Sequence, residues 1–255
     1  MAKVESVRAA LDRHGQSHLL RFYDELSAPE RKSLLEQLTA LDLEELEELI
    51  ERYVRHRPPA APAGRIEPAP VFRPGVDDAS RRVMAEARAR GEELIAAGKV
   101  AAFVVAGGQG TRLGYEGPKG CLEATPVTHK PLFQVFAEQI LAAGRRAGVA
   151  VPWYVMTSPE NDVATRAFFR QKGFFGLAPE DVFFLVQGTL PAIGMDGKLL
   201  LASKGRLATS PDGHGGSLTA LRASGALDDM ARRGVELISY FQVDNPLVRC
   251  VDPLF

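Results

Sequence analysis

A single stretch, VAAFVVAGGQGTRLGYEGPKG from Val100 to Gly120, restricts the possible folds of this chain most strongly. It begins with an unbroken apolar run that ends at Ala106, and such a run predicts a strand buried on both faces. Glycines follow at once, at Gly107, Gly108, Gly110 and Gly114. Because glycine lets the backbone turn sharply and approach a ligand closely, the sequence predicts a binding loop at the carboxyl end of a central strand.

Strand-like and helical segments alternate around this stretch. The runs 151–158, 182–186 and 235–245 predict three further strands. Apolar residues at helical spacing lie over 77–97, 131–149, 161–173 and 218–234, and a hairpin with its turn at Asp196-Gly197 is expected within 191–210. Alternation of strands with helices is typical of α/β proteins, so we expect a Rossmann-like domain whose sheet is mixed but mostly parallel.

The amino-terminal part differs in character from the rest. Residues 1–57 have helical apolar spacing, with Ser27 and Asp42 as expected helix caps and Glu30 completing a capping box with Ser27. Residues 58–76 are rich in proline and alanine, which predicts an extended linker. We therefore expect a helical segment (1–57), a linker (58–76) and a nucleotide-binding domain (77–255) that is incomplete at its carboxyl end.

Composition excludes several classes of function. The 255 residues carry a formal net charge of −1, so the chain as a whole has no electrostatic footprint for nucleic acid. Its two cysteines, Cys121 and Cys250, form no zinc or disulfide pattern. No long uncharged apolar run predicts a membrane span, and the charged start of the chain does not resemble a secretory signal. We expect a cytoplasmic protein without a membrane partner.

The glycine loop differs from two common phosphate-binding motifs. In the dinucleotide fingerprint G-x-G-x-x-G the third glycine would precede Gly114 by one position, which disfavours an NAD-dependent enzyme. In a P-loop the lysine is followed by a hydroxyl residue, whereas Gly120 follows Lys119 here. Arg112 can grip phosphate oxygens with its planar fork, and Lys119 is a compact charge suited to the α-phosphate of a nucleotide.

Polar residues also follow the other predicted strands. Gln187 ends the strand 182–186, Asp244 ends the strand in 235–245, and His214 stands in a second glycine-rich turn. Because parallel strands emerge at the same edge of a sheet, we expect these residues and the loop to line one crevice. Asp244 is the best candidate ligand for Mg²⁺, since magnesium commonly takes only one or two protein carboxylates beside substrate phosphates.

Several motifs together resemble those of a known family. GGQGTRL followed by Pro118-Lys119 resembles the signature of sugar-nucleotide nucleotidyltransferases. With GPKG (117–120), VPWYVMTS (151–158), PDGHGG (211–216), QVDNPLV (242–248) and the amino-terminal GQSHLLRFYDEL (15–26), the chain is similar to the UDP-N-acetylglucosamine pyrophosphorylase group of the UTP–sugar-1-phosphate uridylyltransferases. The resemblance implies a glycosyltransferase-A type fold and formation of a UDP-sugar and pyrophosphate from UTP and a hexose 1-phosphate.

The resemblance also implies roles for individual residues. Arg112 and Lys119 would be catalytic, Asp244 would bind Mg²⁺, and Gln187 with the Gly213-His214 turn would recognise uracil. The set expected to bind the nucleotide is Ala106, Gly107, Gly108, Gly110, Gln187, Gly213 and His214.

The chain departs from the family pattern at two points, which leave alternatives for the sugar substrate and for the function. His214 stands where eukaryotic N-acetylhexosamine enzymes of the group usually have asparagine, and histidine is more similar to UDP-glucose members; N-acetylglucosamine 1-phosphate is slightly favoured over glucose 1-phosphate. Family members continue well beyond the QVDNPLV stretch, so we expect a carboxyl-truncated chain. A non-catalytic nucleotide-binding module is the alternative from another functional class.

Overall fold

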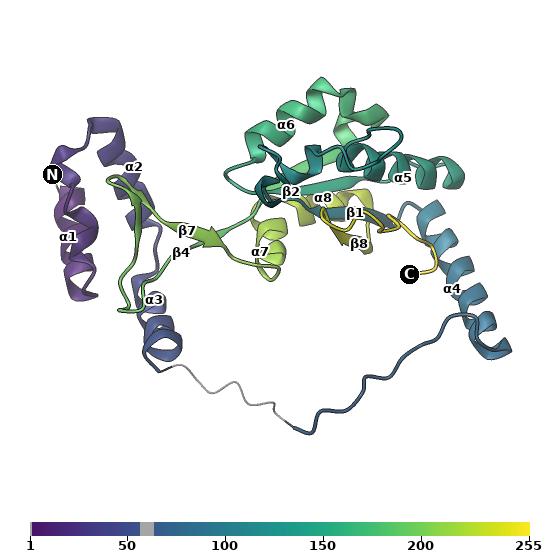
Figure 1. Cartoon of the computed structure of the whole chain (residues 1–255), viewed down its shortest axis with the longest axis horizontal. Coiled ribbons are helices and arrows are strands. Elements are labelled where there is room, and N and C mark those ends of the chain that lie inside the picture. The colour runs from purple at the N-terminus through teal and green to yellow at the C-terminus, as the bar shows by residue number, and fades with distance from the viewer. Residues whose placement is uncertain (1, 57–63) are drawn as a thin grey trace. The chain divides into compact units, whose positions relative to one another are not determined.

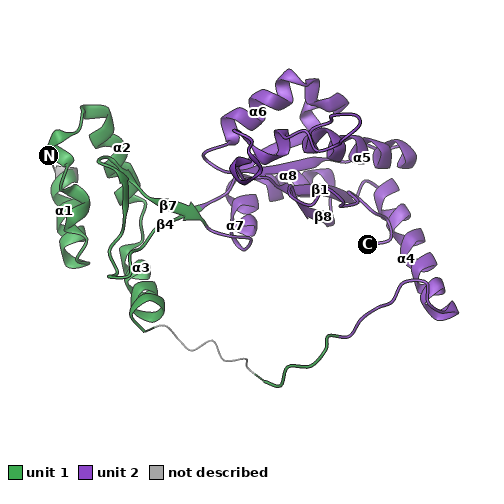
Figure 2. Cartoon of the chain, in the orientation of Figure 1, with its two compact units in different colours: residues 1–69, 189–211 green, residues 70–188, 212–255 purple. Residues whose placement is uncertain are grey.

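The computed structural model describes residues 2–56 and 64–255, which form two compact units (Figure 2). The first unit contains residues 1–69 and 189–211, and the second contains residues 70–188 and 212–255. The boundaries predicted at 57 and 77 leave residues 189–211 in the nucleotide-binding domain. In the structure these residues belong to the first unit, with the amino-terminal helices. Within the predicted linker, residues 58–63 lie outside the described residues, and 64–76 contain neither helix nor strand.

In the first unit, leucines of the amino-terminal helices pack against the inserted hairpins. Leu19, Leu34 and Leu38 share one buried core with Leu199 and Leu207. The helices are α1 (Ala2–Arg13), α2 (Ala28–Thr39) and α3 (Leu43–Ile50), with short helical turns at Ser17–Leu20, Tyr23–Glu25 and Glu51–Arg55. The strands are β4 (Thr189–Pro191), β5 (Leu201–Ser203), β6 (Arg206–Leu207) and β7 (Thr209–Pro211), paired antiparallel as β4–β7 and β5–β6.

Two predicted helix starts in this unit are confirmed. The side chains and backbones of Ser27 and Glu30 form the expected capping box at the start of α2. The carboxylate of Asp42 accepts a hydrogen bond from the Glu45 amide at 3.0 Å and so caps α3. Each cap satisfies backbone donors that a helix start otherwise leaves unpaired.

A buried glutamine fastens the amino-terminal part to the insertion. Gln16 is 4% exposed; its Nε2 donates to the carbonyl of Gly197 and its Oε1 accepts from the Leu199 amide, both at 3.0 Å. The ring of His18 contacts the Leu199 carbonyl at 2.7 Å. The GQSH part of the amino-terminal motif thus has a structural role within this unit.

The second unit contains a four-stranded sheet in the order β3-β2-β1-β8, and all of its strands are parallel (Figure 1). Its strands are β1 (Val100–Val105), β2 (Trp153–Thr157), β3 (Val182–Val186) and β8 (Leu237–Gln242). Its helices are α4 (Asp78–Ala96), α5 (Leu132–Ala147), α6 (Asp162–Gln171), α7 (Gly216–Ala223) and α8 (Ala226–Arg233), with short turns at Thr111–Leu113, Lys119–Cys121, Gly173–Gly176 and Pro179–Asp181. No helix in the described ranges is both long and apolar enough to cross a membrane.

Both faces of this sheet are covered, as the continuous apolar sequence of β1 predicts. Ala102 and Val104 pack toward Phe136 of α5 in one core, whereas Ala101 and Phe103 belong to a second core with α7 and α8. The predicted α/β fold is therefore confirmed. The predicted helix over 218–234 is two helices, because Gly225 adopts a left-handed conformation (φ 77°) that ends the first of them.

The strand order places a topological switch at β1. The chain runs outward from β1 through α5 to β2 and through α6 to β3, and then returns to place β8 on the opposite side of β1. The strand order thus reverses between β1 and β8, and such a reversal opens a crevice at the carboxyl ends of the two strands. In open α/β sheets ligands bind in this crevice.

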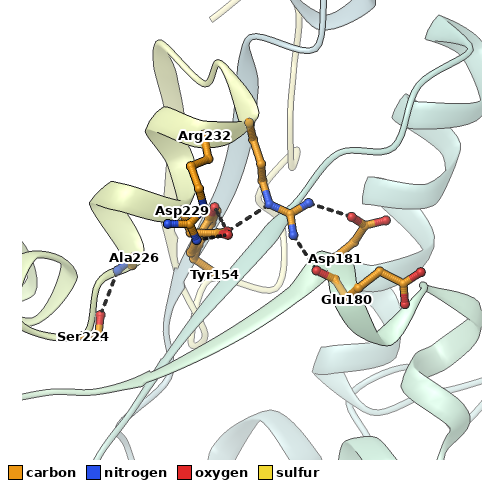
Figure 3. A network of polar contacts seen from close by, with 8 residues as sticks. Tyr154, Glu180, Asp181, Ser224, Ala226, Asp229 and Arg232 are labelled. Carbon is orange, nitrogen blue, oxygen red and sulfur yellow. Dashed lines mark hydrogen bonds and ion pairs between the residues drawn. The ribbon is translucent and has the colours of Figure 1, made fainter.

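A network of charged groups holds α8 against the sheet (Figure 3). The hydroxyl of Tyr154 on β2 donates to Asp229 Oδ2 at 2.7 Å, and Arg233 Nε donates to the same oxygen at 2.9 Å. Arg233 also reaches Asp181, just before β3, at 2.8 Å. Burial by itself raises the pKa of Asp229, but the hydrogen bonds from Tyr154 and Arg233 lower it below its usual range.

Candidate functional site

The glycine loop after β1 is closed by its own backbone. The Gly110 amide donates to the Gly117 carbonyl at 2.9 Å, and the Lys119 amide donates to the Gly108 carbonyl at 3.0 Å. A Cβ atom at Gly110 would lie 2.9 Å from the backbone oxygen of Tyr115, so this closure requires glycine there. The loop therefore returns to its starting point and brings Lys119 back to the carboxyl end of β1.

Lys119 and Asp244 meet at this edge of the sheet. The Nζ of Lys119 donates to Asp244 Oδ2 at 3.3 Å, although the two residues are far apart in sequence. Their side chains are 22% and 54% exposed, so the pair is open to solvent. Asp244 follows β8 and the glycine loop follows β1, which places the pair at the topological switch.

A pocket of about 620 Å³ opens around this pair. Its polar lining includes Arg112, Lys119 and Asp244, together with the backbone of Gly108. Arg112 is exposed and makes no ion pair with any other described residue, so its guanidinium is available to an anion. A larger hollow of about 840 Å³ lies between α4, α5 and residues 249–253, away from the carboxyl ends of the strands.

Gln187 reaches the same strand end from β3. Its side chain is buried, and a Cβ atom at Gly107 would lie 2.2 Å from Gln187 Oε1. The amide therefore rests on the backbone of the loop. The adjacent Gly188 faces Asp212: a Cβ at Gly188 would lie 2.3 Å from Asp212 Oδ2, and one at Gly216 would lie 2.0 Å from Asp212 Oδ1. The end of β3 and the start of α7 thus meet around the Asp212 carboxylate.

The second glycine turn projects into solvent beside β8. Gly213 has a left-handed conformation (φ 76°), and both Gly213 and His214 are exposed. The His214 ring lies 2.7 Å from the hydroxyl of Tyr240 through its Nδ1. Neither Gln187 nor His214 lines the pocket around Lys119. Arg112, Lys119 and Asp244 thus line one pocket. Gln187 lies next to this pocket because its side chain packs on Gly107 of the loop, and His214 contacts Tyr240 of β8.

Sequence reasoning missed the residue that holds the loop in place. Asn161 is fully buried, and its Nδ2 donates to the carbonyls of Ala106 at 3.0 Å and Gly108 at 3.4 Å. Its Oδ1 accepts from the Ser158 amide at 2.8 Å. In the sequence Asn161 stands only as the first residue of the helix expected over 161–173; its position just after the end of a predicted strand is the signal that could have identified it.

Asp212 is the second residue that the sequence did not mark. Its Oδ1 is buried and has no hydrogen-bond partner among the described residues. A buried carboxylate oxygen without a partner is costly, so this atom calls for a partner that the described residues do not supply.

The two cysteine thiols are not candidates for nucleophiles or metal ligands at this site. Cys121 follows Lys119 closely but is buried, and its burial raises its pKa to about 12. Cys250 is likewise buried, with a pKa raised to about 12 by the same cause. Thiols with such pKa values are protonated and unreactive near neutral pH.

The residues around the pocket suit a metal ion that is coordinated partly by the substrate, and not a metal ion enclosed by protein ligands alone. The described residues contain no group of three or more His, Cys, Asp or Glu side chains that could hold an ion alone. Asp244 is exposed beside the pocket and offers one carboxylate, which matches the magnesium sites that are completed by water and substrate phosphates.

Comparison with known proteins finds relatives from one family. The family described as UTP–glucose-1-phosphate uridylyltransferase matches residues 45–255. The chain is 43% identical over 270 aligned residues to the UDP-N-acetylhexosamine pyrophosphorylase-like protein 1 of Homo sapiens, which covers 100% of this chain and 53% of that protein. It is 38% identical to the UDP-N-acetylglucosamine diphosphorylase 2 of Arabidopsis thaliana, covering 95% of this chain and 50% of that protein.

A solved structure shows the same relationship. The uridine diphosphate N-acetylglucosamine pyrophosphorylase of Trypanosoma brucei, solved in complex with an inhibitor, matches with a TM-score of 0.77 and 25% identity, over 100% of this chain and 54% of that chain. The chain therefore spans about half the length of the relatives it matches. With the family matched over residues 45–255 and the loop, Lys119 and Asp244 gathered at one sheet edge, this chain belongs to the UTP–glucose-1-phosphate uridylyltransferase family.

Proposed function

We propose that this chain carries the nucleotide site of a uridylyltransferase that makes a UDP-sugar and pyrophosphate from UTP and a hexose 1-phosphate. The observation that carries the proposal is the meeting of Lys119 and Asp244, 3.3 Å apart, beside the glycine loop at the topological switch. Ligands of open α/β sheets bind at this position.

The chemistry of this reaction matches the residues at the pocket. A phosphate oxygen of the sugar 1-phosphate forms a bond to the α-phosphorus of UTP, and the bond from that phosphorus to the bridging oxygen of the β-phosphate breaks, releasing pyrophosphate. The attacking oxygen is already anionic, so no general base is required. The main barrier is the approach of several negative charges, which is lowered by positioning and by positive charge.

The loop and its cations supply that positive charge. Backbone N–H groups at Gly107 and Gly108 would face the phosphates, while Gly110, whose amide donates to the Gly117 carbonyl, would keep the loop closed around them. Arg112 would bind two phosphate oxygens with its fork. Lys119 would contact the α-phosphate, where charge develops as the bond forms. A partly exposed ion pair such as Lys119–Asp244 contributes only about 0–1 kcal/mol, so a phosphate can replace the carboxylate at little cost.

Asp244 is the residue that would hold Mg²⁺. When bound, the ion would neutralise charge on the phosphates. Lys119 keeps the Asp244 carboxylate at the rim of the pocket and compensates its charge before substrate enters. The groups proposed to contact the uracil and the nucleoside are Gln187, Ala106, which follows β1, and the Gly213-His214 turn.

The favoured sugar substrate is N-acetylglucosamine 1-phosphate. The relatives of human, plant and trypanosome origin are named for UDP-N-acetylhexosamine or UDP-N-acetylglucosamine. Glucose 1-phosphate is less favoured, and its support is the histidine at position 214.

The test is pyrophosphate release by this chain, with UTP, Mg²⁺ and each sugar phosphate in turn. We expect release with N-acetylglucosamine 1-phosphate to exceed release with glucose 1-phosphate. Lys119→Ala should lower turnover by about 100- to 1000-fold, since a transition-state charge contact of this kind contributes roughly 3–4 kcal/mol. UTP binding without any pyrophosphate release would refute the transfer reaction and leave a nucleotide-binding module.

A further inference from the structure

The hydrogen bond between Tyr240 and His214 links two parts of the second unit that are far apart in sequence. Tyr240 lies on β8 and His214 lies in the turn before α7. The hydroxyl of Tyr240 is 2.7 Å from His214 Nδ1, and the two rings meet edge to face at 6.4 Å between centroids. His214 is exposed and Tyr240 is 42% exposed, so their contact lies at the surface and outside the buried cores.

Both partners of this contact are themselves held in place. Tyr240 is the register partner of Phe103 on β1, and their rings lie 5.8 Å apart. The carbonyl of His214 accepts hydrogen bonds from the amide and the hydroxyl of Ser217, at 3.2 and 2.6 Å. With its backbone and its Nδ1 engaged, His214 has Nε2 as the ring atom without a hydrogen-bond partner among the described residues.

The hydrogen bond can run in either direction, and the direction in which the Tyr240 hydroxyl donates fixes the tautomer of His214. Partial burial raises the pKa of Tyr240, while its hydrogen bond with the Gln242 side chain acts in the opposite direction. Tyr240 is therefore a neutral phenol near pH 7, with one proton to donate. In a neutral imidazole one nitrogen accepts and the other donates, so a phenol that donates to Nδ1 leaves the proton on Nε2.

We propose that Tyr240 is a positioning residue that fixes His214 as the Nε2–H tautomer, so that Nε2–H is presented as a hydrogen-bond donor to an acceptor oxygen of bound UTP. This inference rests on the proposed function, because it assigns the His214 turn to the bound nucleotide. It goes further by naming the group that orients the histidine and the ring atom that contacts UTP. An exposed imidazole without such a partner would populate both tautomers and several rotamers.

The first test reads the tautomer directly in the chain without nucleotide. Long-range ¹H–¹⁵N spectra of ¹⁵N-histidine-labelled chain report the state of each ring nitrogen, and His214→Asn identifies the signals of His214 among the 5 histidines. At a pH where the ring is neutral we expect Nε2–H in the parent chain and a mixture of tautomers in Tyr240→Phe. An Nδ1–H ring in the parent chain, or a tautomer unchanged in Tyr240→Phe, overturns the inference.

The second test measures UTP affinity by calorimetry. Tyr240→Phe keeps the ring on Phe103 and removes only the hydroxyl, so a merely structural role predicts no change. We expect binding about 2- to 10-fold weaker, the usual effect of one neutral hydrogen bond. In a His214→Asn background the same change should have no effect, and Tyr53→Phe, at an exposed tyrosine of the first unit, is the matched control.

The outcomes separate this inference from the proposed function. Absence of UTP binding by the parent chain refutes the proposed function and with it the assignment of Nε2–H to bound UTP, while the tautomer spectra still decide what Tyr240 does to His214. UTP binding that is equally strong in Tyr240→Phe, or a loss of affinity that persists in the His214→Asn background, overturns the inference and leaves the proposed function standing.

Discussion

Gly108→Ala tests the glycine loop because the added methyl group would clash with a ligand bound to the loop but not with the protein itself. A Cβ atom at Gly108 would lie 3.6 Å from both Cε and Nζ of Lys119, which is ordinary van der Waals contact. The residue is not among the glycines with positive φ, so alanine fits its backbone. A glycine-to-alanine change at such a site stabilises a protein by about 0.4–1 kcal/mol, so the folded state should not be weakened.

The expected effect falls on UTP. If the phosphates lie against the backbone at this point, the methyl group occupies their space, and overpacking of this kind costs about 1–3 kcal/mol. That energy corresponds to UTP binding about 5- to 150-fold weaker. The neighbouring glycines give no such clean result, because a Cβ at Gly107 would lie 2.2 Å from Gln187 and one at Gly110 would lie 2.8 Å from Tyr115.

The assay pairs calorimetric titration with UTP and thermal unfolding of each variant. Gly64→Ala is the matched control, since a Cβ there meets no atom within 4 Å and the residue does not line the pocket. An unchanged UTP affinity in Gly108→Ala would show that the phosphates do not approach this backbone. A lower unfolding temperature would show that the fold itself needs glycine at position 108, which would refute an effect confined to UTP.

Three further predictions concern the scaffold of the site. Asn161→Ala removes a buried amide from two carbonyls at the end of β1; urea unfolding should show a loss of about 1–3 kcal/mol, and an unchanged midpoint would refute its role. Tyr154→Phe deletes a hydrogen bond to the Asp229 carboxylate, so we expect a loss of about 1.5–3 kcal/mol, with Tyr53→Phe as the neutral control. Cys121 and Cys250 have pKa values raised from 9.0 to about 12, so their contribution to stability is complete below pH 9 and is lost as the pH rises toward 12. A double cysteine-to-alanine variant should lose less stability over that pH range than the parent chain, and equal losses would contradict the burial of the thiols.

Much of the fold of the second unit follows from local sequence signals. The strand 182–186 has the predicted bounds, and the helices α4, α5 and α6 lie within a few residues of their predicted ranges. These elements have long apolar patterns and clear ends, such as the left-handed Gly148 after α5. The break at Gly225 was missed because a single glycine within a helical pattern does not by itself decide between a continuous helix and two short ones.

The partners of distant segments could not be predicted in the same way. The turn at Asp196-Gly197 is a local signal, but the packing of residues 189–211 with the first unit depends on Leu199 and Leu207 meeting leucines of distant helices. The same limit applies to the site. The glycine loop, Lys119 and Asp244 follow from motifs at strand ends, whereas Asn161 acts through a strand order that no local pattern shows.

The most direct test of the central claim is a crystal structure of this chain with UTP and Mg²⁺. We expect the triphosphate along Gly107, Gly108 and Lys119, with Mg²⁺ near Asp244 and the uracil toward Gln187 and His214. A triphosphate bound elsewhere, for example in the hollow between α4 and α5, would refute this nucleotide site, as would a nucleotide in the pocket that leaves the ion pair of Lys119 and Asp244 unchanged.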